Sequence, residues 1–280
     1  MKGISLIIAW AFCLASYAQT NCAKTPAFAL KAGYSSPILS TSDRMRGGMV
    51  LFRQGAAGEM IDPYQHPSWK RAGRLGGFVV TERGEIFVVP VPNVNTLENP
   101  PERQNILQRV DPETGEMSDA ISIPVEFAPS QKNPYGLVGI AYDCKRRLLY
   151  LTTLSGSSAA TERGKIVVVS VDRMQILAQL EGLDAIGVGV FDDGARHFLL
   201  AGSARSSQIF KVALDSEGKF VSAPSAALRL DELNILRARK IRFRGEEIVI
   251  DATEFYYNLV AQTEFETVTK VLSISDLGKR

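Results

Sequence analysis

Residues that carry catalytic chemistry are scarce in this sequence. Only two histidines occur, His66 and His197, which excludes a metal site built on several imidazoles. The patterns G-x-S-x-G and H-E-x-x-H, a phosphate-binding loop and a G-x-G-x-x-G ahead of a helix are all missing. Because nothing marks a nucleophile beside His66, the sequence disfavours a Ser-His-Asp hydrolase.

An excess of charge is also missing. The 32 basic and 30 acidic residues are interspersed and leave a net charge of +2, so we expect no nucleic-acid partner. After the N-terminus, no apolar run reaches the roughly twenty residues that span a bilayer, so we expect no membrane span. The 280 residues are 45% hydrophobic, which is ordinary globular composition and excludes a disordered or fibrous chain.

Residues 1–18 have the features of a secretory signal peptide. Lys2 supplies a positive start, an apolar stretch follows, and Ser16-Tyr17-Ala18 offers the small-x-small pattern that signal peptidase cleaves. Neither Cys13 nor Cys22 follows a lipoprotein box. We therefore predict a periplasmic or secreted protein whose mature domain covers residues 19–280.

Cysteine is rare as well. Of the three cysteines, Cys13 would leave with the signal peptide, which leaves Cys22 and Cys144. An oxidising compartment would allow these two to form a disulfide. The alternative is two unconnected thiols, and the sequence leaves both open because it does not give the distance between them.

Helical periodicity is nearly absent, and short runs of Val, Ile, Leu, Phe and Tyr take its place. A four-strand order recurs along the chain, with the tight turns at Gly84, Lys145, Gly194 and Gly245 lying 49 to 61 residues apart. This period is typical of propeller blades. We predict an all-β fold, a single β-propeller of five or six four-stranded blades. A β-sandwich, the alternative, gives no reason for such a repeat.

One phrase of the sequence resembles a known superfamily. Asn133-Pro-Tyr-Gly-Leu-Val-Gly-Ile-Ala-Tyr-Asp143, followed by Leu149-Tyr-Leu-Thr152, is similar to the phrase that recurs in NHL-type and TolB-like six-bladed propellers. The gluconolactonase-like and strictosidine-synthase-like enzymes share that fold. The resemblance implies the fold and leaves the chemistry open. Counting repeats gives four clear blades and an irregular first one around Gly48–Arg53, so the blade number also stays open.

Loop lengths differ between the two faces of the predicted propeller. The turns that join strands one to two and three to four are tight, whereas the other connections are long, at residues 91–104, 124–136, 154–164, 202–207 and 223–238. Because function is usually carried by the longer loops of a rigid scaffold, we predict that the long-loop face is the working face. The segment 91–103 is long enough to be a lid or contact loop.

Arginines and aromatic residues gather on the segments of this face. Arginine binds anionic groups in a bidentate manner, so they suit a small molecule, a glycan or a protein; solvated charges and aromatics packed between blades are the alternative. The predicted binding residues are Arg74, Arg103, Asn133, Tyr135, Asp184, Arg205, Arg239 and Glu254.

The gluconolactonase-like resemblance also implies a divalent ion, held at the channel mouth by Glu, Asn and Asp. Asn133 and Asp184 match such positions, but Arg74 and Arg239 stand where acidic ligands would be expected. We therefore predict no cofactor, with calcium as the alternative. The function predicted first is a binding module. The alternative is a metal-assisted hydrolase or lactonase, so whether the protein is an enzyme stays open.

Overall fold

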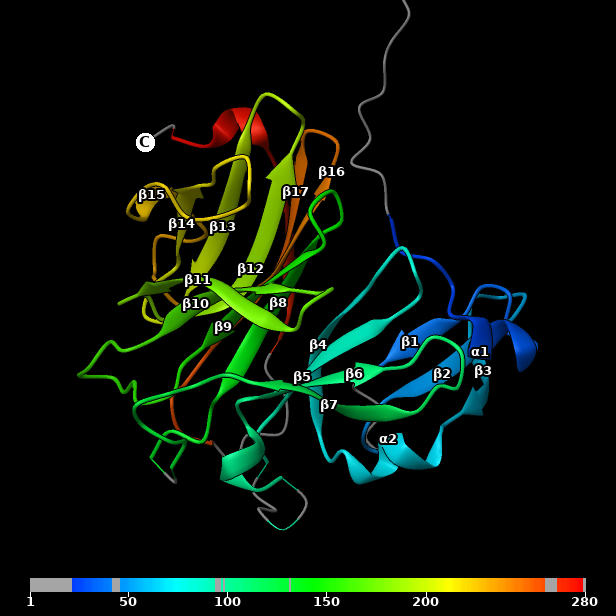
Figure 1. Ribbon diagram of the computed structural model, residues 1–280. Helices are drawn as coiled ribbons and strands as arrows, with labels where there is room; N and C mark the ends of the chain where they lie inside the picture. The colour runs from blue at the N-terminus through cyan, green and yellow to red at the C-terminus, as the bar shows by residue number, and fades with distance from the viewer. Residues whose placement is uncertain are drawn as a thin grey trace, which may run out of the picture.

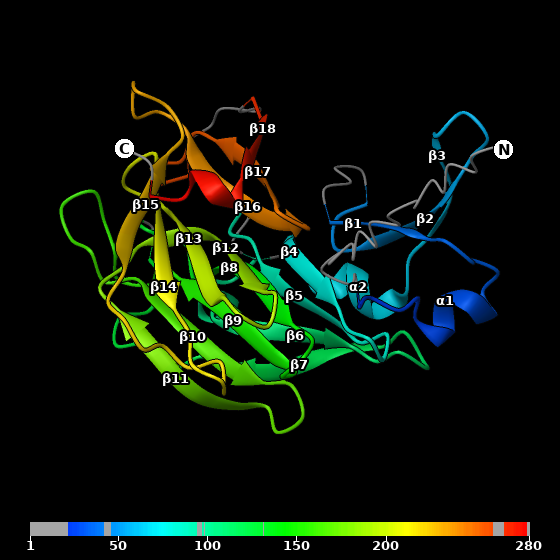
Figure 2. The same ribbon diagram turned by 90° about the horizontal axis from the view of Figure 1, so that it is seen from above.

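The structure is a computed structural model that describes residues 22–41, 46–93, 97, 99–130, 132–259 and 266–278. The predicted signal peptide, residues 1–18, lies outside the described residues. Five small antiparallel sheets follow one another in a ring and form a five-bladed β-propeller (Figures 1 and 2). The predicted all-β class and the fold implied by the NHL- and gluconolactonase-like resemblance are confirmed, with five blades.

The first sheet contains β1 (Ile38–Ser40), β2 (Val50–Gln54) and β3 (Met60–Tyr64). The second contains β4 (Leu75–Val80), β5 (Ile86–Pro90), β6 (Ile106–Val110) and β7 (Met117–Ser122). The third contains β8 (Leu137–Asp143), β9 (Leu148–Thr153), β10 (Lys165–Ser170) and β11 (Gln175–Glu181). The fourth contains β12 (Ala185–Asp192), β13 (His197–Ser203), β14 (Gln208–Ala213) and β15 (Ser225–Arg229), and the fifth β16 (Arg237–Arg244), β17 (Glu247–Thr253) and β18 (Val268–Ser273).

Four short helical segments lie outside the sheets: α1 (Ala27–Lys31), α2 (Pro67–Arg71), η1 (Pro101–Arg103) and η2 (Ile274–Asp276). α2 begins where His66 caps the amide of Ser68 and Pro67 takes the first helical position. Within the residues described, none of the helices has the length and the apolar character of a membrane-crossing segment.

The prediction of four-stranded blades holds for three of the five sheets. In the described part of the chain, the first and last sheets have three strands each. The chain leaves β3 towards β4 through α2, on the same face where it leaves β7 and β11 for the next blade. β3 therefore corresponds to the fourth strand of a complete blade, and the innermost position of the first blade has no described strand.

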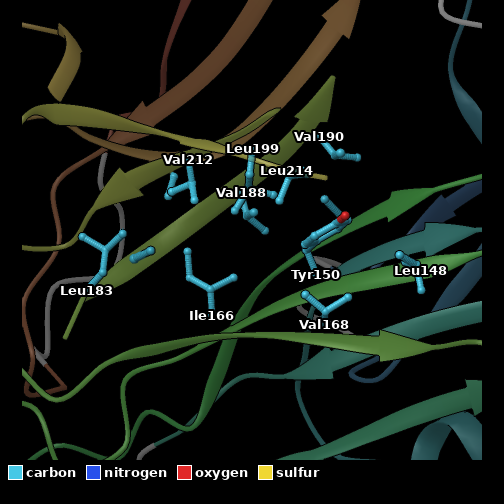
Figure 3. Packing of buried hydrophobic residues seen from close by; sticks show 13 residues of the cluster. Leu148, Tyr150, Ile166, Val168, Leu183, Val188, Val190, Leu199, Val212 and Leu214 are labelled. Atoms are coloured by element: carbon cyan, nitrogen blue, oxygen red, sulfur yellow. The ribbon is translucent and has the colours of Figure 1, made fainter. Parts of the chain in front are cut away.

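Each pair of consecutive sheets encloses one apolar cluster. Between the third and fourth sheets, Tyr150, Ile166 and Val168 pack against Val188 and Leu199, all nearly inaccessible to solvent (Figure 3). Corresponding clusters lie between the first and second, second and third, and fourth and fifth sheets. Burial of both faces of a sheet against its neighbours is the packing that defines a propeller.

The fourth and fifth blades approach most closely at two glycines of β12. A Cβ atom on Gly187 would lie 2.4 Å from the carbonyl oxygen of Ala238, and one on Gly189 would lie 2.7 Å from that of Ile241. Only glycine permits this contact between backbones. The close approach brings the loops of the two blades together at the end of the ring where the long connections lie.

The asymmetry of the connections holds in part. The connections 182–184 and 204–207 are short although their face carries most of the long ones, and 214–224 on the other face is long. The predicted loop 223–238 was wrong in that β15 lies within it. Tight turns such as those after β4, β8 and β12 lie on one face, at the top of Figure 1, whereas α2, η1 and most of the long connections lie at the opposite face, at the bottom. The two faces are called here the short-turn face and the long-loop face.

Candidate functional site: the long-loop face

Asp184 is the centre of a buried polar cluster on the long-loop face. Its side chain is fully buried just ahead of β12. Oδ1 accepts hydrogen bonds from Ser157 Oγ and the Gly164 amide, and Oδ2 accepts from Tyr257 Oη and from Arg205 Nη1 at 3.1 Å. Burial and the hydrogen bond to Asp184 raise the pKa of Tyr257, so its hydroxyl stays protonated and donates. Both carboxylate oxygens are thus occupied by the protein's own donors.

Arg205 is held by carbonyl groups as well as by Asp184. Nη1 and Nη2 donate to the carbonyl oxygens of Ser158 and Ala159, both at 2.8 Å. The guanidinium therefore fixes the 154–164 loop against the fourth blade. Its predicted role as a ligand contact stays a prediction, and its donors already have intramolecular acceptors.

Asn133 and Tyr135 are part of the packing beneath this cluster. The Asn133 amide donates to the carbonyl oxygens of Leu154 and Ser157 and accepts from the Tyr135 backbone amide. The Tyr135 ring packs on Phe255, with 5.1 Å between ring centroids. Burial raises the pKa of Tyr135, and the nearby positive charge of Arg239 opposes this rise. The structure thus brings together Asn133, Tyr135, Asp184, Arg205 and Arg239.

Two of the predicted arginines have open guanidinium groups. The side chains of Arg74 and Arg239 make no hydrogen bond or ion pair to the residues that the structure describes, and Arg239 is exposed. Glu254 lies on the rim and accepts a hydrogen bond from Tyr256 Oη at 2.8 Å. Of the predicted residues, Arg74 and Arg239 are therefore the ones with donors available to a partner.

Arg103 lies apart from these residues. It pairs with Asp119 at 2.6 Å on the outer part of the second blade, where it lines a small cavity with Asn99, Gln104 and Gln108. The backbone amide of Arg74 donates to Asn99 Oδ1. The predicted site residues thus divide into an inner group around Asp184 and an outer group around this cavity.

Exposed apolar side chains are a second feature of the long-loop face, and apart from its aromatic residues they were not predicted from the sequence. They come from four connections of this face: Leu97 (95% exposed), Phe127 (40%), Leu233 (80%), Ile235 (46%) and Tyr256 (45%). The signal that could have found them is the presence of large apolar residues inside long, otherwise polar loops. β16, Arg237–Arg244, carries five basic residues among its eight, of which Arg239 was a predicted binding residue.

The short-turn face is built differently, from ion pairs between blades. Arg146 of the third blade pairs with Asp143 and with Asp192 of the fourth, at 2.9 and 2.6 Å. Arg147 pairs with Glu82 and Glu85 of the second blade. Burial alone would raise the pKa of Asp192, but hydrogen bonds from Lys145, Arg146 and the Gly194 amide outweigh it and lower this pKa. The charged residues of this face thus form ion pairs that connect neighbouring blades.

Cys22 and Cys144 lie side by side on the short-turn face as free thiols. Burial, followed by a hydrogen bond with the Cys144 thiol, raises the pKa of Cys22 to about 12. The backbone next to Cys22 is fixed, because the Lys24 amide donates to the Thr81 carbonyl at 3.0 Å. The two thiols lie next to each other but are not bonded, so the predicted disulfide between Cys22 and Cys144 stays a prediction.

No group of three or more His, Cys, Asp or Glu side chains suited to a metal ion occurs among the described residues. The two positions that the resemblance implied for a divalent ion are used otherwise, since the Asn133 amide and the Asp184 carboxylate are saturated by protein groups. These two side chains, as arranged here, do not fit a calcium site, which needs six to eight free oxygen ligands.

The sheets, the clusters between them and the two unlike faces define a five-bladed propeller with one loop-bearing face. No family model matches this chain, and no curated protein matches it. Similar solved structures include a nidogen/laminin complex, with 13% identity over 82% of this chain and 73% of that one and a TM-score of 0.48. A PQQ-bound aldose sugar dehydrogenase from Streptomyces coelicolor has 11% identity over 80% of this chain and 72% of that one, with a TM-score of 0.43. A gluconolactonase from Xanthomonas campestris has 14% identity over 72% of this chain and 64% of that one, with a TM-score of 0.43.

Proposed function

We propose that this protein is an exported binding propeller whose long-loop face recognises a protein partner. The observation that carries the proposal is the uneven distribution of exposed apolar side chains. Among the described connections between strands, five of them stand on the long-loop face and one, Val221, on the short-turn face. The others are Leu30 on α1, Met60 and Ile61 on β3, and Val271 on β18. Exposed large apolar side chains beside open arginines are typical of protein-binding surfaces, where aromatic residues and Arg dominate the binding energy.

A polar ligand such as a glycan is supported less well by this face. Glycan recognition depends on free hydrogen-bonding side chains, and Asn133, Asp184 and Arg205 already bond within the protein. The lactonase alternative needs oxygen ligands for a metal, and the same saturation leaves it without them. Protein recognition uses what the face leaves available: Leu233, Tyr256 and the guanidinium groups of Arg74 and Arg239.

Site-directed photocrosslinking in the native host tests the proposal. A benzophenone amino acid at position 233 or 256 should give a discrete cross-linked species, and the same probe at Val221 or Lys145 should give none. The substitution Arg74→Gln combined with Arg239→Gln should reduce that species at least tenfold, because the two guanidinium groups without a described partner are lost. Arg173→Gln, an exposed arginine in a tight turn of the other face, is the matched control.

Two results would overturn the proposal. Cross-links from Val221 and Lys145 but not from positions 233 and 256 would show that the working face is the opposite one. The absence of cross-links from all four positions, with the variants folded and exported, would show that the long-loop face has no protein partner. A species that persists unchanged in the Arg74→Gln, Arg239→Gln variant would reflect non-specific contact.

A further inference from the structure

A small cavity opens beside η1, in the outer part of the second blade. Its volume is about 160 Å³, and its lining shares no residue with the cluster around Asp184. A site for one water needs roughly 10–15 Å³ of such space, so the cavity has room for several waters or a small ligand. Its lining includes Arg71, Leu75, Pro90, Asn99, Arg103 and Gln104.

Gln104 is the most informative of these residues. It is 2% exposed, and its backbone is fixed, since its amide donates to Pro101 and its carbonyl accepts from Leu137 at 2.7 Å. Its side chain is different: Oε1 is buried without a partner, and Nε2 makes no hydrogen bond to the described residues. A buried amide group without partners is costly, and such groups in native proteins usually meet a ligand or an ordered water.

Asn99 adds a second unsatisfied group to the same wall. The backbone amide of Arg74 donates to its Oδ1 at 2.5 Å, which fixes the orientation of the side-chain amide. Nδ2 is then the free end, and it is buried without a partner in a residue that is 5% exposed. Two residues that line the cavity thus carry buried polar atoms without a partner, the acceptor Gln104 Oε1 and the donor Asn99 Nδ2.

Positive charge and an apolar surface complete the cavity. Arg71, at the end of α2, is exposed and makes no hydrogen bond or ion pair among the described residues. Arg103 and Gln108 are held in place by Asp119, at 2.6 and 2.8 Å. Ala72, Leu75, Pro90, Leu97 and Pro100 form the apolar part of the lining. The unpaired guanidinium of Arg71, on the same lining as the unpaired amide groups of Asn99 and Gln104, suits a carboxylate ligand.

We propose that this cavity is a binding site for a small hydroxy acid. The carboxylate would pair with Arg71. A hydroxyl group both donates and accepts, so it matches the acceptor of Gln104 and the donor of Asn99 at once. The cavity shares Leu97 with the exposed apolar side chains of the long-loop face. The proposed polar contacts of the ligand involve Arg71, Asn99 and Gln104 instead, so binding at this site can be tested separately from the protein-binding function.

Calorimetric titration of the purified protein with tartrate, succinate and erythritol tests the site. Tartrate has carboxylates and hydroxyls, succinate lacks the hydroxyls, and erythritol lacks the carboxylates. Tartrate should bind at least tenfold more tightly than the other two. Arg71→Gln should weaken tartrate binding about tenfold, and Lys70→Gln, a neighbouring exposed charge that does not line the cavity, should leave it unchanged.

The variant Gln104→Met separates a ligand-binding role from a structural one. Methionine has nearly the volume of glutamine and removes the unpaired amide. If Gln104 waits for a ligand, this variant should lose tartrate binding and melt a few degrees higher than the wild type without ligand. A lower melting temperature would show a structural role, and equal binding of succinate and tartrate would overturn the hydroxy-acid assignment. No binding of tartrate by the folded wild type would overturn it as well.

Discussion

At the scale of single residues, the role of a charged side chain depends on whether its hydrogen-bonding atoms are already used. Arg205 and Arg74 belong to the same residue type and lie on the same face. Arg205 donates to Asp184 and to two carbonyl groups, whereas the Arg74 side chain has no described partner. The first is therefore a structural residue of the loop scaffold, and the second is available to bind.

The structural role of Asp184 gives the first prediction. Asp184→Ala removes the acceptor for four donors and leaves Arg205, 27% exposed at its side chain, with only the longer ion pair to Glu162 at 3.9 Å. We expect the free energy of unfolding to fall by about 3–5 kcal/mol, the usual cost of breaking a buried ion pair. Urea denaturation measures this loss. Asp119→Ala, which breaks the exposed pair with Arg103, should cost about 1 kcal/mol or less, and equal losses for the two variants would contradict this role.

The residues of the site were predictable in part, for physical reasons. Loop length placed Arg74, Arg205 and Asp184 on one face, because strand alternation fixes the face of every connection. Their partners were not predictable, because carbonyl oxygens such as those of Ser158 and Ala159 become acceptors only through the path of the 154–164 loop. The unpaired amide of Gln104 likewise emerges only from three-dimensional packing.

At the scale of strands and turns, the short-turn face holds neighbouring blades together by charge. Arg146 connects the turn after β8 to Asp192 at the end of β12 and also donates to the Ser216 carbonyl. Burial opposes ionisation of Asp143, but hydrogen bonds from His197 and Arg146 outweigh it and lower its pKa. Hydrogen bonds lower the pKa of Asp192 in the same way.

These lowered pKa values give the second prediction, on acid stability. A carboxylate whose pKa is lower in the folded protein stabilises the fold above its unfolded pKa of about 3.9, and this stabilisation is lost as pH falls towards the folded pKa. Arg146→Gln should therefore cost about 1–3 kcal/mol at pH 7. The difference from the wild type should stay constant down to about pH 5 and shrink visibly by about pH 3.

Urea denaturation between pH 3 and pH 7 measures that difference directly. Arg173→Gln, in an exposed turn and without an ion pair among the described residues, should show no such pH dependence. A difference between the wild type and Arg146→Gln that is the same at pH 3 as at pH 7 would show that Asp143 and Asp192 do not depend on Arg146 for their ionisation.

The N-terminal segment gives the third prediction. Cys22 lies against Cys144, and Pro26 crosses the turn at Gly84, where a Cβ would lie 3.0 Å from the Pro26 Cα. We expect oxidised glutathione to convert the two thiols into a disulfide by exchange, lowering the intact mass by about 2 Da. The bond closes a loop of about 120 residues and should raise the melting temperature by about 5–10 °C.

Cys22→Ser is the control, since it should show neither change. In the reduced protein, Cys22 should react slowly with iodoacetamide at pH 8, because burial and the Cys144 hydrogen bond keep its pKa near 12 and the thiolate is the reactive form. Glutathione adducts on both cysteines without a disulfide would show that the two sulfur atoms do not come within bonding reach.

Most strands were predictable to within a few residues, but β15 was not, since it lies in the segment predicted as a loop, and the helices were missed. β8 to β14 follow the runs of Val, Ile and Leu between tight turns, since a strand needs only local alternation and a turn to end it. α2 was missed because five residues make little more than one turn, too short for a helical period, and its start depends on the His66 cap. Its consequence is large, because α2 carries Arg71 to the cavity.

At the scale of the whole molecule, the repeat predicted the propeller but not the form of its ends. The four-strand order is a local property and recurs in the second, third and fourth sheets. The first and last blades are three-stranded in the described chain, whereas the repeat had marked only the first as irregular and counted the last as a clear copy. The resemblance that suggested six blades did not predict the number correctly. It concerns a phrase within one blade and carries no information on how many blades the chain contains.

Stability at this scale is shared between neighbouring blades, which gives the fourth prediction. Residues 183–228 hold nearly all of the fourth sheet, whose two faces supply one side of the cluster with Tyr150 and one side of the cluster with Ile241. Deleting them should expose both adjoining sheets, and each large apolar side chain left in water costs about 1.5–3 kcal/mol. We therefore expect insoluble protein, measured as the soluble fraction after expression.

A single Gly187→Ala substitution is the milder variant, and its Cβ clash with Ala238 should lower the melting temperature while the protein stays soluble. A deletion variant that remains soluble and melts cooperatively at the wild-type temperature would show that the blades are stable without their neighbours, which the continuous packing between the third, fourth and fifth sheets contradicts.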